Sequence, residues 1–123
     1  MIAFNHFNFN VLDLDRSLAF YREALNLTVD REKEAGDGSF KLVYLKDSEN
    51  SPFRLELTWL RDRTEPYDLG EQEFHLAFRT DRFDQLLERH RAMGCVCFEN
   101  PDMGVYFIED PDGYWIELVP AGN

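Results

Sequence analysis

Two histidines and two glutamates occupy matched places in the two halves of this 123-residue chain. His6 opens an apolar run, and Glu56 lies in the run that closes the first half; His75 and Glu117 repeat this arrangement in the second half. Imidazole nitrogens and carboxylate oxygens are common ligands of divalent first-row metal ions. The four residues therefore predict one metal site whose ligands come from two copies of a module.

The facing of these residues supports a shared role. Side chains in a strand alternate between two faces, so residues two apart point the same way. His6 alternates with an apolar stripe that includes Phe7 and Phe9, and both Glu56 and Glu117 alternate with apolar residues on their own runs. We therefore expect the apolar face to pack on helices and the face that carries the candidate ligands to line a cavity.

Taken singly, each candidate has an ordinary structural interpretation. A lone strand histidine is more often a satisfied packing residue than a ligand, and a lone glutamate is more often a solvated sheet residue. The ligand interpretation is favoured because two His-then-Glu pairs recur in the same context. His90 lacks such a partner, so we expect a packing or helix-end role for it.

The elements expected around the first pair form a β-α-β-β-β module. Asp13 or Asp15 suits the helix N-cap, the helix should end near Asn26, and Asp37-Gly38 suits a hairpin turn. The expected strands cover residues 3 to 11, 28 to 34, 40 to 45 and 53 to 60.

The second half predicts the same module. Thr80 or Asp81 suits the helix N-cap, Gly94 suits the helix stop, and the turn at residues 110 to 113 contains proline and glycine. The expected strands cover residues 74 to 79, 95 to 98, 104 to 109 and 114 to 119. We predict an α+β protein of one domain over residues 1–123, with modules at about 1–61 and 72–120 and a polar connector at 61–72.

Bulk properties narrow the possible partners. The chain is 44% hydrophobic and carries a formal net charge of −11, so it should pack a core and repel nucleic acid and anionic membranes. It contains neither an apolar stretch of membrane-spanning length nor a signal-peptide pattern, which predicts a cytoplasmic location. Cys95 and Cys97 are expected to be reduced strand residues, because residues two apart in a strand lack disulfide geometry.

Four stretches carry a resemblance to a known family: NHFNFNVLDLDRSLAFYREALNL, FRLELTW, YDLGEQEFHLAF and EDPDGYWIELV. Together they resemble the glyoxalase I (lactoylglutathione lyase) family of the vicinal oxygen chelate superfamily. The resemblance implies two tandem βαβββ modules that form a curved mixed sheet around a metal-binding cleft. It also implies that nickel, cobalt or zinc is bound by His6, Glu56, His75 and Glu117, with two further positions held by water.

The chemistry that the resemblance implies is detoxification of methylglyoxal. The hemithioacetal of methylglyoxal and a low-molecular-weight thiol is isomerised to a hydroxyacyl thioester, and Glu117 moves the proton between adjacent carbons. Well-known glutathione-using bacterial members carry Arg where Asn10 stands, Asn where Leu60 stands, and a longer loop where this chain has NPDMGV. The thiol is therefore glutathione or another small thiol. A homodimer is expected, as in other small members of the fold.

Three alternatives within the superfamily remain open. An extradiol dioxygenase would use two histidines and one carboxylate, and Glu56 as a fourth ligand argues against it. A methylmalonyl-CoA epimerase-like enzyme would need more basic residues near the cleft. A bleomycin-resistance-like binding protein would not need the four-residue set. The metal found in protein purified without added metal would discriminate among these classes.

Overall fold

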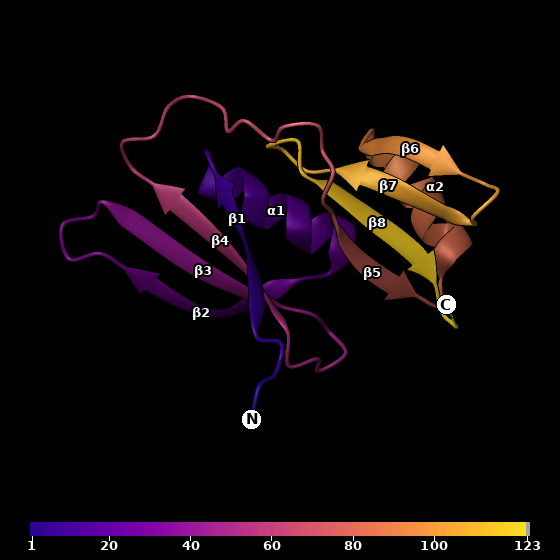
Figure 1. Ribbon diagram of the computed structural model, residues 1–123, viewed down its shortest axis with the longest axis horizontal. Coiled ribbons are helices and arrows are strands. Elements are labelled where there is room, and N and C mark those ends of the chain that lie inside the picture. Colours follow the sequence, from indigo (N-terminus) through magenta and orange to yellow (C-terminus); the bar gives the residue numbers. More distant parts are fainter. Residues whose placement is uncertain (123) are drawn as a thin grey trace. The chain divides into compact units, whose positions relative to one another are not determined.

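A computed structural model describes residues 1–122 of the chain; Asn123, the last residue of the predicted domain, lies outside the described part. The chain divides into two units, Met1–Tyr67 and Asp68–Asn123, and each holds one helix and four strands (Figure 1). The α+β class and the two βαβββ modules are confirmed. That the modules form one domain stays a prediction.

The first unit is a four-stranded mixed sheet with a helix. Its strands lie in the order β1-β4-β3-β2, with β1 parallel to β4 and the other neighbours antiparallel. The elements are β1 (His6–Val11), α1 (Leu14–Leu25), β2 (Thr28–Glu34), β3 (Phe40–Lys46) and β4 (Arg54–Leu60). The first and last strands of the unit are therefore neighbours, and this pairing brings the start of the module to its end.

Helix α1 has defined signals at both ends. The Asp13 side chain accepts a hydrogen bond from the Arg16 amide at 3.1 Å, so Asp13 rather than Asp15 is the N-cap. At the other end Asn26 adopts a left-handed conformation, with φ 57°, that closes the helix as predicted. Tyr21 and Ala24 face inward and are buried with Phe9 and Leu57 of the sheet, which makes the apolar side of β1 and β4 the core of this unit.

The second unit repeats the arrangement. Its strands lie in the order β5-β8-β7-β6, with β5 parallel to β8. The elements are β5 (Leu76–Thr80), α2 (Phe83–Met93), β6 (Val96–Asn100), β7 (Val105–Glu109) and β8 (Trp115–Pro120). Among the described helices, none is long and apolar enough to cross a membrane.

Two expectations about the start of this unit are wrong in detail. The N-cap position of α2 is Arg82, whose side chain makes no capping bond, whereas Thr80 and Asp81 were expected there. The Thr80 hydroxyl instead accepts the Arg82 amide at 3.1 Å, forming a local turn that delays the helix start. Strand β5 begins at Leu76, so His75 lies immediately before the strand rather than inside it.

The core of the second unit contains a buried polar pair. His90 on α2 and Tyr106 on β7 are 0% and 1% exposed, and their Nδ1 and hydroxyl oxygen are 2.9 Å apart. Burial raises the pKa of the Tyr106 phenol, so the phenol stays protonated. This bond satisfies both groups inside an apolar interior, and the predicted packing role of His90 is confirmed.

The cysteines are free, as expected. Burial raises the pKa of the Cys97 thiol to about 11, so its reactive thiolate form is scarce near neutral pH.

Candidate functional site

The first candidate pair lies near the start of the paired parallel strands β1 and β4. His6 is the first residue of β1, and Glu56 is the third residue of β4. The His6 Nε2 and Glu56 Oε1 atoms are 3.7 Å apart, and their side chains are 39% and 11% exposed. The pair therefore joins a solvent-accessible imidazole to a nearly buried carboxylate.

Asn5 orients the His6 ring. The His6 Nδ1 atom lies 2.6 Å from the Asn5 Oδ1 atom. An amide oxygen can only accept, so Nδ1 is the donor in this contact, and in the neutral ring Nε2 keeps its lone pair. Histidines that bind metals commonly donate their second ring N–H in this way, and the nitrogen left available here is the one directed at Glu56.

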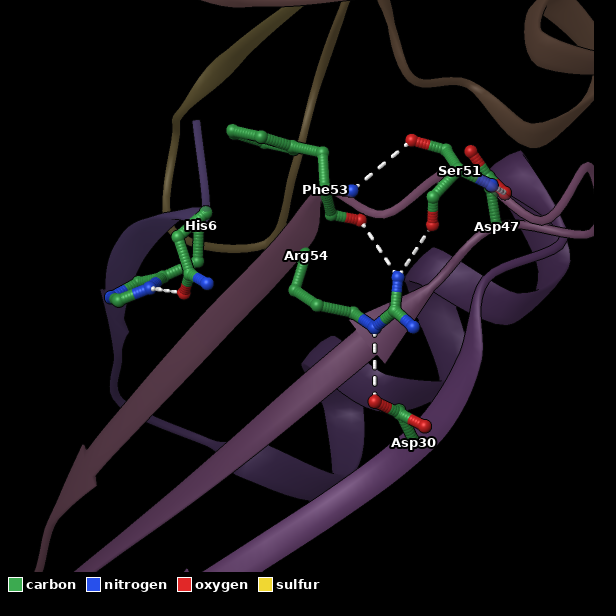
Figure 2. Close-up of polar contacts among 7 residues, drawn as sticks. His6, Asp30, Asp47, Ser51, Phe53 and Arg54 are labelled. Atoms are coloured by element: carbon green, nitrogen blue, oxygen red, sulfur yellow. Dashed lines mark hydrogen bonds and ion pairs between the residues drawn. The ribbon is translucent and has the colours of Figure 1, made fainter. Parts of the chain in front are cut away.

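Arg54, the first residue of β4, makes several hydrogen bonds beside His6. It is the cross-strand neighbour of His6, and its guanidinium donates to Asp30 at 2.9 Å and to the carbonyl oxygens of Ser51 and Phe53 (Figure 2). The Arg54 guanidinium, chiefly through this hydrogen bond, lowers the pKa of Asp30. Arg54 thus links the residues just before β4 to Asp30 on β2.

The second candidate pair repeats the geometry of the first. The His75 Nε2 and Glu117 Oε1 atoms are 3.4 Å apart, and their side chains are 41% and 18% exposed. Glu117 is the third residue of β8, just as Glu56 is the third residue of β4. The predicted pairing of His6 with Glu56 and of His75 with Glu117 is therefore present within each unit.

The strand register is the same in both units. Glu56 lies opposite Asn8, two residues after His6, and Glu117 lies opposite Ala77, two residues after His75. Residues two apart on a strand share a face. In each unit the histidine and the glutamate therefore point the same way, with an offset of two residues along the paired strands. The repeated spacing in the sequence thus corresponds to a repeated spacing in the sheet.

The tight turn before β8 positions Glu117. The buried Asp110 carboxylate accepts the amides of Asp112 and Tyr114, both at 2.9 Å. Gly113 takes φ 95° and donates its amide to the Asp110 carbonyl oxygen at 3.0 Å. The predicted turn is confirmed, and it returns the chain so that β8 lies between β5 and β7.

One aromatic residue packs against each histidine, and sequence reasoning missed both. The Tyr44 ring meets His6 edge-on with centroids 5.7 Å apart, and the Phe107 ring meets His75 in the same way at 5.1 Å. Tyr44 is the cross-strand partner of Glu56, and Phe107 is the cross-strand partner of Glu117. The signal was present in the sequence, but reading it requires the register of β3 on β4 and of β7 on β8.

The donors of each pair fit one divalent cation. Two atoms bound to the same ion through bonds of about 2.1 Å lie about 3 Å apart at a right angle and about 3.4 Å apart at a tetrahedral angle. The separations of 3.7 and 3.4 Å need little adjustment to reach this range. Neither unit contains, within residues 1–122, a group of three or more His, Cys, Asp or Glu side chains that could hold a metal ion. Convergence of all four residues on one ion therefore stays a prediction.

Comparisons with known proteins agree with the resemblance. Residues 3–118 match the family described as the Glyoxalase/Bleomycin resistance protein/Dioxygenase superfamily. A probable lactoylglutathione lyase of Synechocystis sp. is 33% identical, with 96% of this chain and 95% of that protein covered. The lactoylglutathione lyase of Neisseria meningitidis serogroup B is 36% identical, with coverage of 93% and 87%.

A solved structure shows the same fold. The trypanothione-dependent glyoxalase I of Leishmania major superposes with a TM-score of 0.86 and 31% identity, covering 98% of this chain and 87% of that one. The sequence match over nearly the whole chain, the two βαβββ units and the structural likeness agree with one another. This chain belongs to the Glyoxalase/Bleomycin resistance protein/Dioxygenase superfamily and, within it, to the glyoxalase I family.

Proposed function

We propose that this protein is a metal-dependent isomerase of the glyoxalase I type, a lactoylglutathione lyase-like enzyme. Its substrate is the hemithioacetal that methylglyoxal forms with a low-molecular-weight thiol, and its product is the hydroxyacyl thioester. The observation that carries this proposal is the repeated His–Glu pair, with the same register and nearly the same separation in both units.

His6, Glu56, His75 and Glu117 would hold one nickel, cobalt or zinc ion, with two positions left to water. Two carboxylates neutralise a divalent cation, which lowers the cost of placing it in a poorly solvated site. When bound, the ion would stabilise negative charge that develops on two neighbouring oxygens of the substrate. Ligand type does not discriminate among these metals, because mixed imidazole and carboxylate sites accept several first-row ions.

We assign the proton transfer to Glu117. Isomerisation takes a proton from the carbon that bears the thiol sulfur and returns it to the adjacent carbon, so one carboxylate can serve as base and then as acid with no net proton change. Glu117 is 18% exposed, compared with 11% for Glu56, which leaves it the more accessible of the two carboxylates. His6, Glu56 and His75 would then serve as ligands.

The thiol is glutathione or another low-molecular-weight thiol. Asn10 stands where glutathione-using bacterial members carry Arg, and its amide oxygen accepts from Asn8 at 2.7 Å. Leu60 stands where they carry Asn, and it presents an apolar side chain that is 37% exposed. The structurally similar Leishmania major enzyme is trypanothione-dependent, which supports testing thiols other than glutathione.

We further propose a homodimer in the cytoplasm that acts without nucleic acid or membrane partners. The net charge of −11 supports the exclusion of polyanionic partners.

The proposed function is tested by metal titration and by turnover. Metal-free protein is titrated with nickel and cobalt, and conversion of methylglyoxal with each of several thiols is followed through formation of the thioester. We expect one ion to bind for each set of four proposed ligands. We also expect isomerase activity to depend on that ion.

Glu56→Ala should weaken metal binding by about tenfold or more, because a ligand is lost. Glu34→Ala is the matched control, because it removes an exposed carboxylate from β2. Undiminished affinity in Glu56→Ala would remove that residue from the site. A wild-type protein that is inactive with every thiol would refute the isomerase assignment.

A further inference from the structure

Strand β2 carries charges of alternating sign, and a bulge of one residue decides which sign each face receives. Val29 lies opposite Leu45, but the next paired residue is Arg31, opposite Tyr44, so Asp30 is the extra residue of the bulge. A shift of one residue exchanges the two faces of a strand. The facing of every residue of β2 after Asp30 therefore depends on this bulge.

Without the bulge, β2 would add acidic side chains to the face of the sheet that carries Glu56. Asp30 would lie opposite Tyr44, and Glu32 and Glu34 would follow on the same face at steps of two residues. In the structure these two glutamates point to the opposite face, because they lie opposite the residues of β3 that alternate with Tyr44. The basic residues of β2 take their place.

The basic side chains that reach this face from β2 are Arg31 and Lys33. Arg31 lies opposite Tyr44, which in turn lies opposite Glu56, and Lys33 lies opposite Leu42 one step further along the strand. Neighbouring strands are about 4.8 Å apart, so the backbone at Arg31 lies about 10 Å from the backbone at Glu56. The bulge thus places two cations across the sheet from a proposed metal ligand.

The guanidinium of Arg31 is accessible and lies beside the proposed site. Its central carbon is 4.2 Å from the centroid of the Tyr44 ring, and that ring meets the His6 ring edge-on with centroids 5.7 Å apart. Arg31 and Lys33 are both exposed, and within residues 1–122 neither forms an ion pair. Both side chains can therefore receive an anion.

The strand residues on this face carry more positive than negative charge. The basic residues are Arg31, Lys33, Lys46 and Arg54. The acidic residues are Glu56 and Asp30, and Asp30 is paired with Arg54 at 2.9 Å (Figure 2). The chain as a whole has a formal net charge of −11. An anionic molecule is therefore attracted to this face and repelled by most of the remaining surface.

We propose that Arg31, assisted by Lys33, binds a carboxylate group of the thiol cosubstrate, so that the enzyme selects an anionic thiol. A guanidinium can bind a carboxylate through two parallel hydrogen bonds. A thiol of tripeptide size extends over about 10 Å, at about 3.4 Å per residue, and so reaches from the proposed ligands to β2. This inference deepens the proposed function and rests on it. It makes the bulge at Asp30 a determinant of substrate choice.

Two forms of one thiol test the proposal by turnover. Glutathione carries carboxylates and its diethyl ester carries none, although both present the same sulfur. For wild-type protein the KM of the glutathione hemithioacetal should be about fivefold below that of the ester form, the upper range for an exposed ion pair. Arg31→Gln should raise the KM of the glutathione form about fivefold and leave kcat within about twofold. The KM of the ester form should stay within about twofold, because the ester offers no carboxylate to Arg31.

Lys41→Gln is the matched control. Lys41 lies on the neighbouring strand β3 but points to the opposite face, where it is paired with Glu32 at 3.1 Å. The substitution removes one positive charge from the same sheet, and the KM of each thiol form should stay within about twofold of wild type. An effect as large as that of Arg31→Gln would show that net charge, rather than the position of Arg31, determines KM.

A binding measurement tests the same contact without turnover or metal. S-methylglutathione is titrated into metal-free protein and followed by calorimetry. Arg31→Gln should weaken its binding about fivefold, and Lys41→Gln should leave it within about twofold. Added salt should weaken binding to wild-type protein, because salt screens the attraction between exposed charges. Acetate at the concentration of the thiol analogue should not displace it, because acetate lacks the rest of the thiol.

Four outcomes separate this proposal from the proposed function. Wild-type protein that treats glutathione and its diethyl ester alike overturns the carboxylate contact. An unchanged glutathione KM in Arg31→Gln also overturns it, and the isomerase assignment then stands. Displacement of S-methylglutathione by equimolar acetate shows a general anion site and overturns the thiol assignment. If S-methylglutathione binding depends on Arg31 but wild-type protein turns over no hemithioacetal, the isomerase assignment fails and the carboxylate contact stands.

Discussion

Glu56 and Glu117 are the residues on which the proposed chemistry depends, and they differ in exposure and in neighbours. Both lie third on the closing strand of their unit, and both lie within 4 Å of a histidine nitrogen. If both bind the ion and one also moves the proton, their conservative substitutions should have different effects.

Glu117→Gln should retain the fold and some metal binding but should lose isomerase activity by about 10²–10⁴-fold, the usual effect of losing a general base. The amide can coordinate through its oxygen but cannot accept the proton. Glu56→Gln should reduce activity less, because a ligand oxygen remains. The measurement is kcat at full metal occupancy, confirmed by metal analysis of each variant. Near-wild-type turnover in Glu117→Gln would show that another group is the base.

At the residue scale, the sequence predicted the two His–Glu pairs but not the residues that surround them. The four His and Glu candidates were found because their types and alternation recur in the chain. Tyr44 and Phe107 were missed because each lies opposite its glutamate on a neighbouring strand. That position depends on the register between the strands, which side-chain alternation alone does not define. Asn5 was missed because its contact with His6 depends on a side-chain rotamer.

At the scale of elements, the C-terminal ends of the helices were easier to predict than their N-terminal ends. Asn26 and Gly94 end their helices in the left-handed conformation, which few residue types adopt readily, so residue type alone was informative. The start of α2 was mispredicted because several neighbouring polar residues suit an N-cap, and tertiary context chose among them. The strands agreed with their predicted ranges to within about three residues, the usual uncertainty at element ends.

Gly94→Ala tests the helix stop of the second unit. Gly94 has φ 74°, and an added Cβ would meet open space, so the expected destabilisation of about 1–2 kcal/mol arises from the backbone conformation alone. Gly36 also faces open space but lies outside the left-handed region, and Gly36→Ala should change the unfolding free energy by less than about 0.5 kcal/mol or stabilise slightly. Urea unfolding of both variants measures the difference. Equal effects would show that the conformation of Gly94 is not what matters.

At the scale of the whole molecule, exposed apolar side chains and a large net charge act in opposite directions. Ile2 and Phe4, ahead of β1, are 103% and 93% exposed, and Met103 is 70% exposed. Such residues favour association with a second copy, whereas a formal charge of −11 on each chain opposes it.

We expect sedimentation at micromolar concentration to give the mass of two chains. Added salt should tighten the dimer, because screening weakens the repulsion between two like-charged copies more than it weakens apolar contact. A mass of one chain at both low and high salt would contradict the dimer. Weaker association at high salt would show that ion pairs, rather than apolar contact, hold the copies together.

The parallel ladders β1-β4 and β5-β8 also determine when each pair can form as the chain is made. In both units the histidine is synthesised first and the glutamate arrives on the last strand, so the contact closes a loop that contains the rest of the unit. A nascent chain that has not yet delivered its closing strand holds an imidazole without its carboxylate partner. The proposed metal binding and proton transfer would therefore be withheld from incomplete chains until each unit has finished folding.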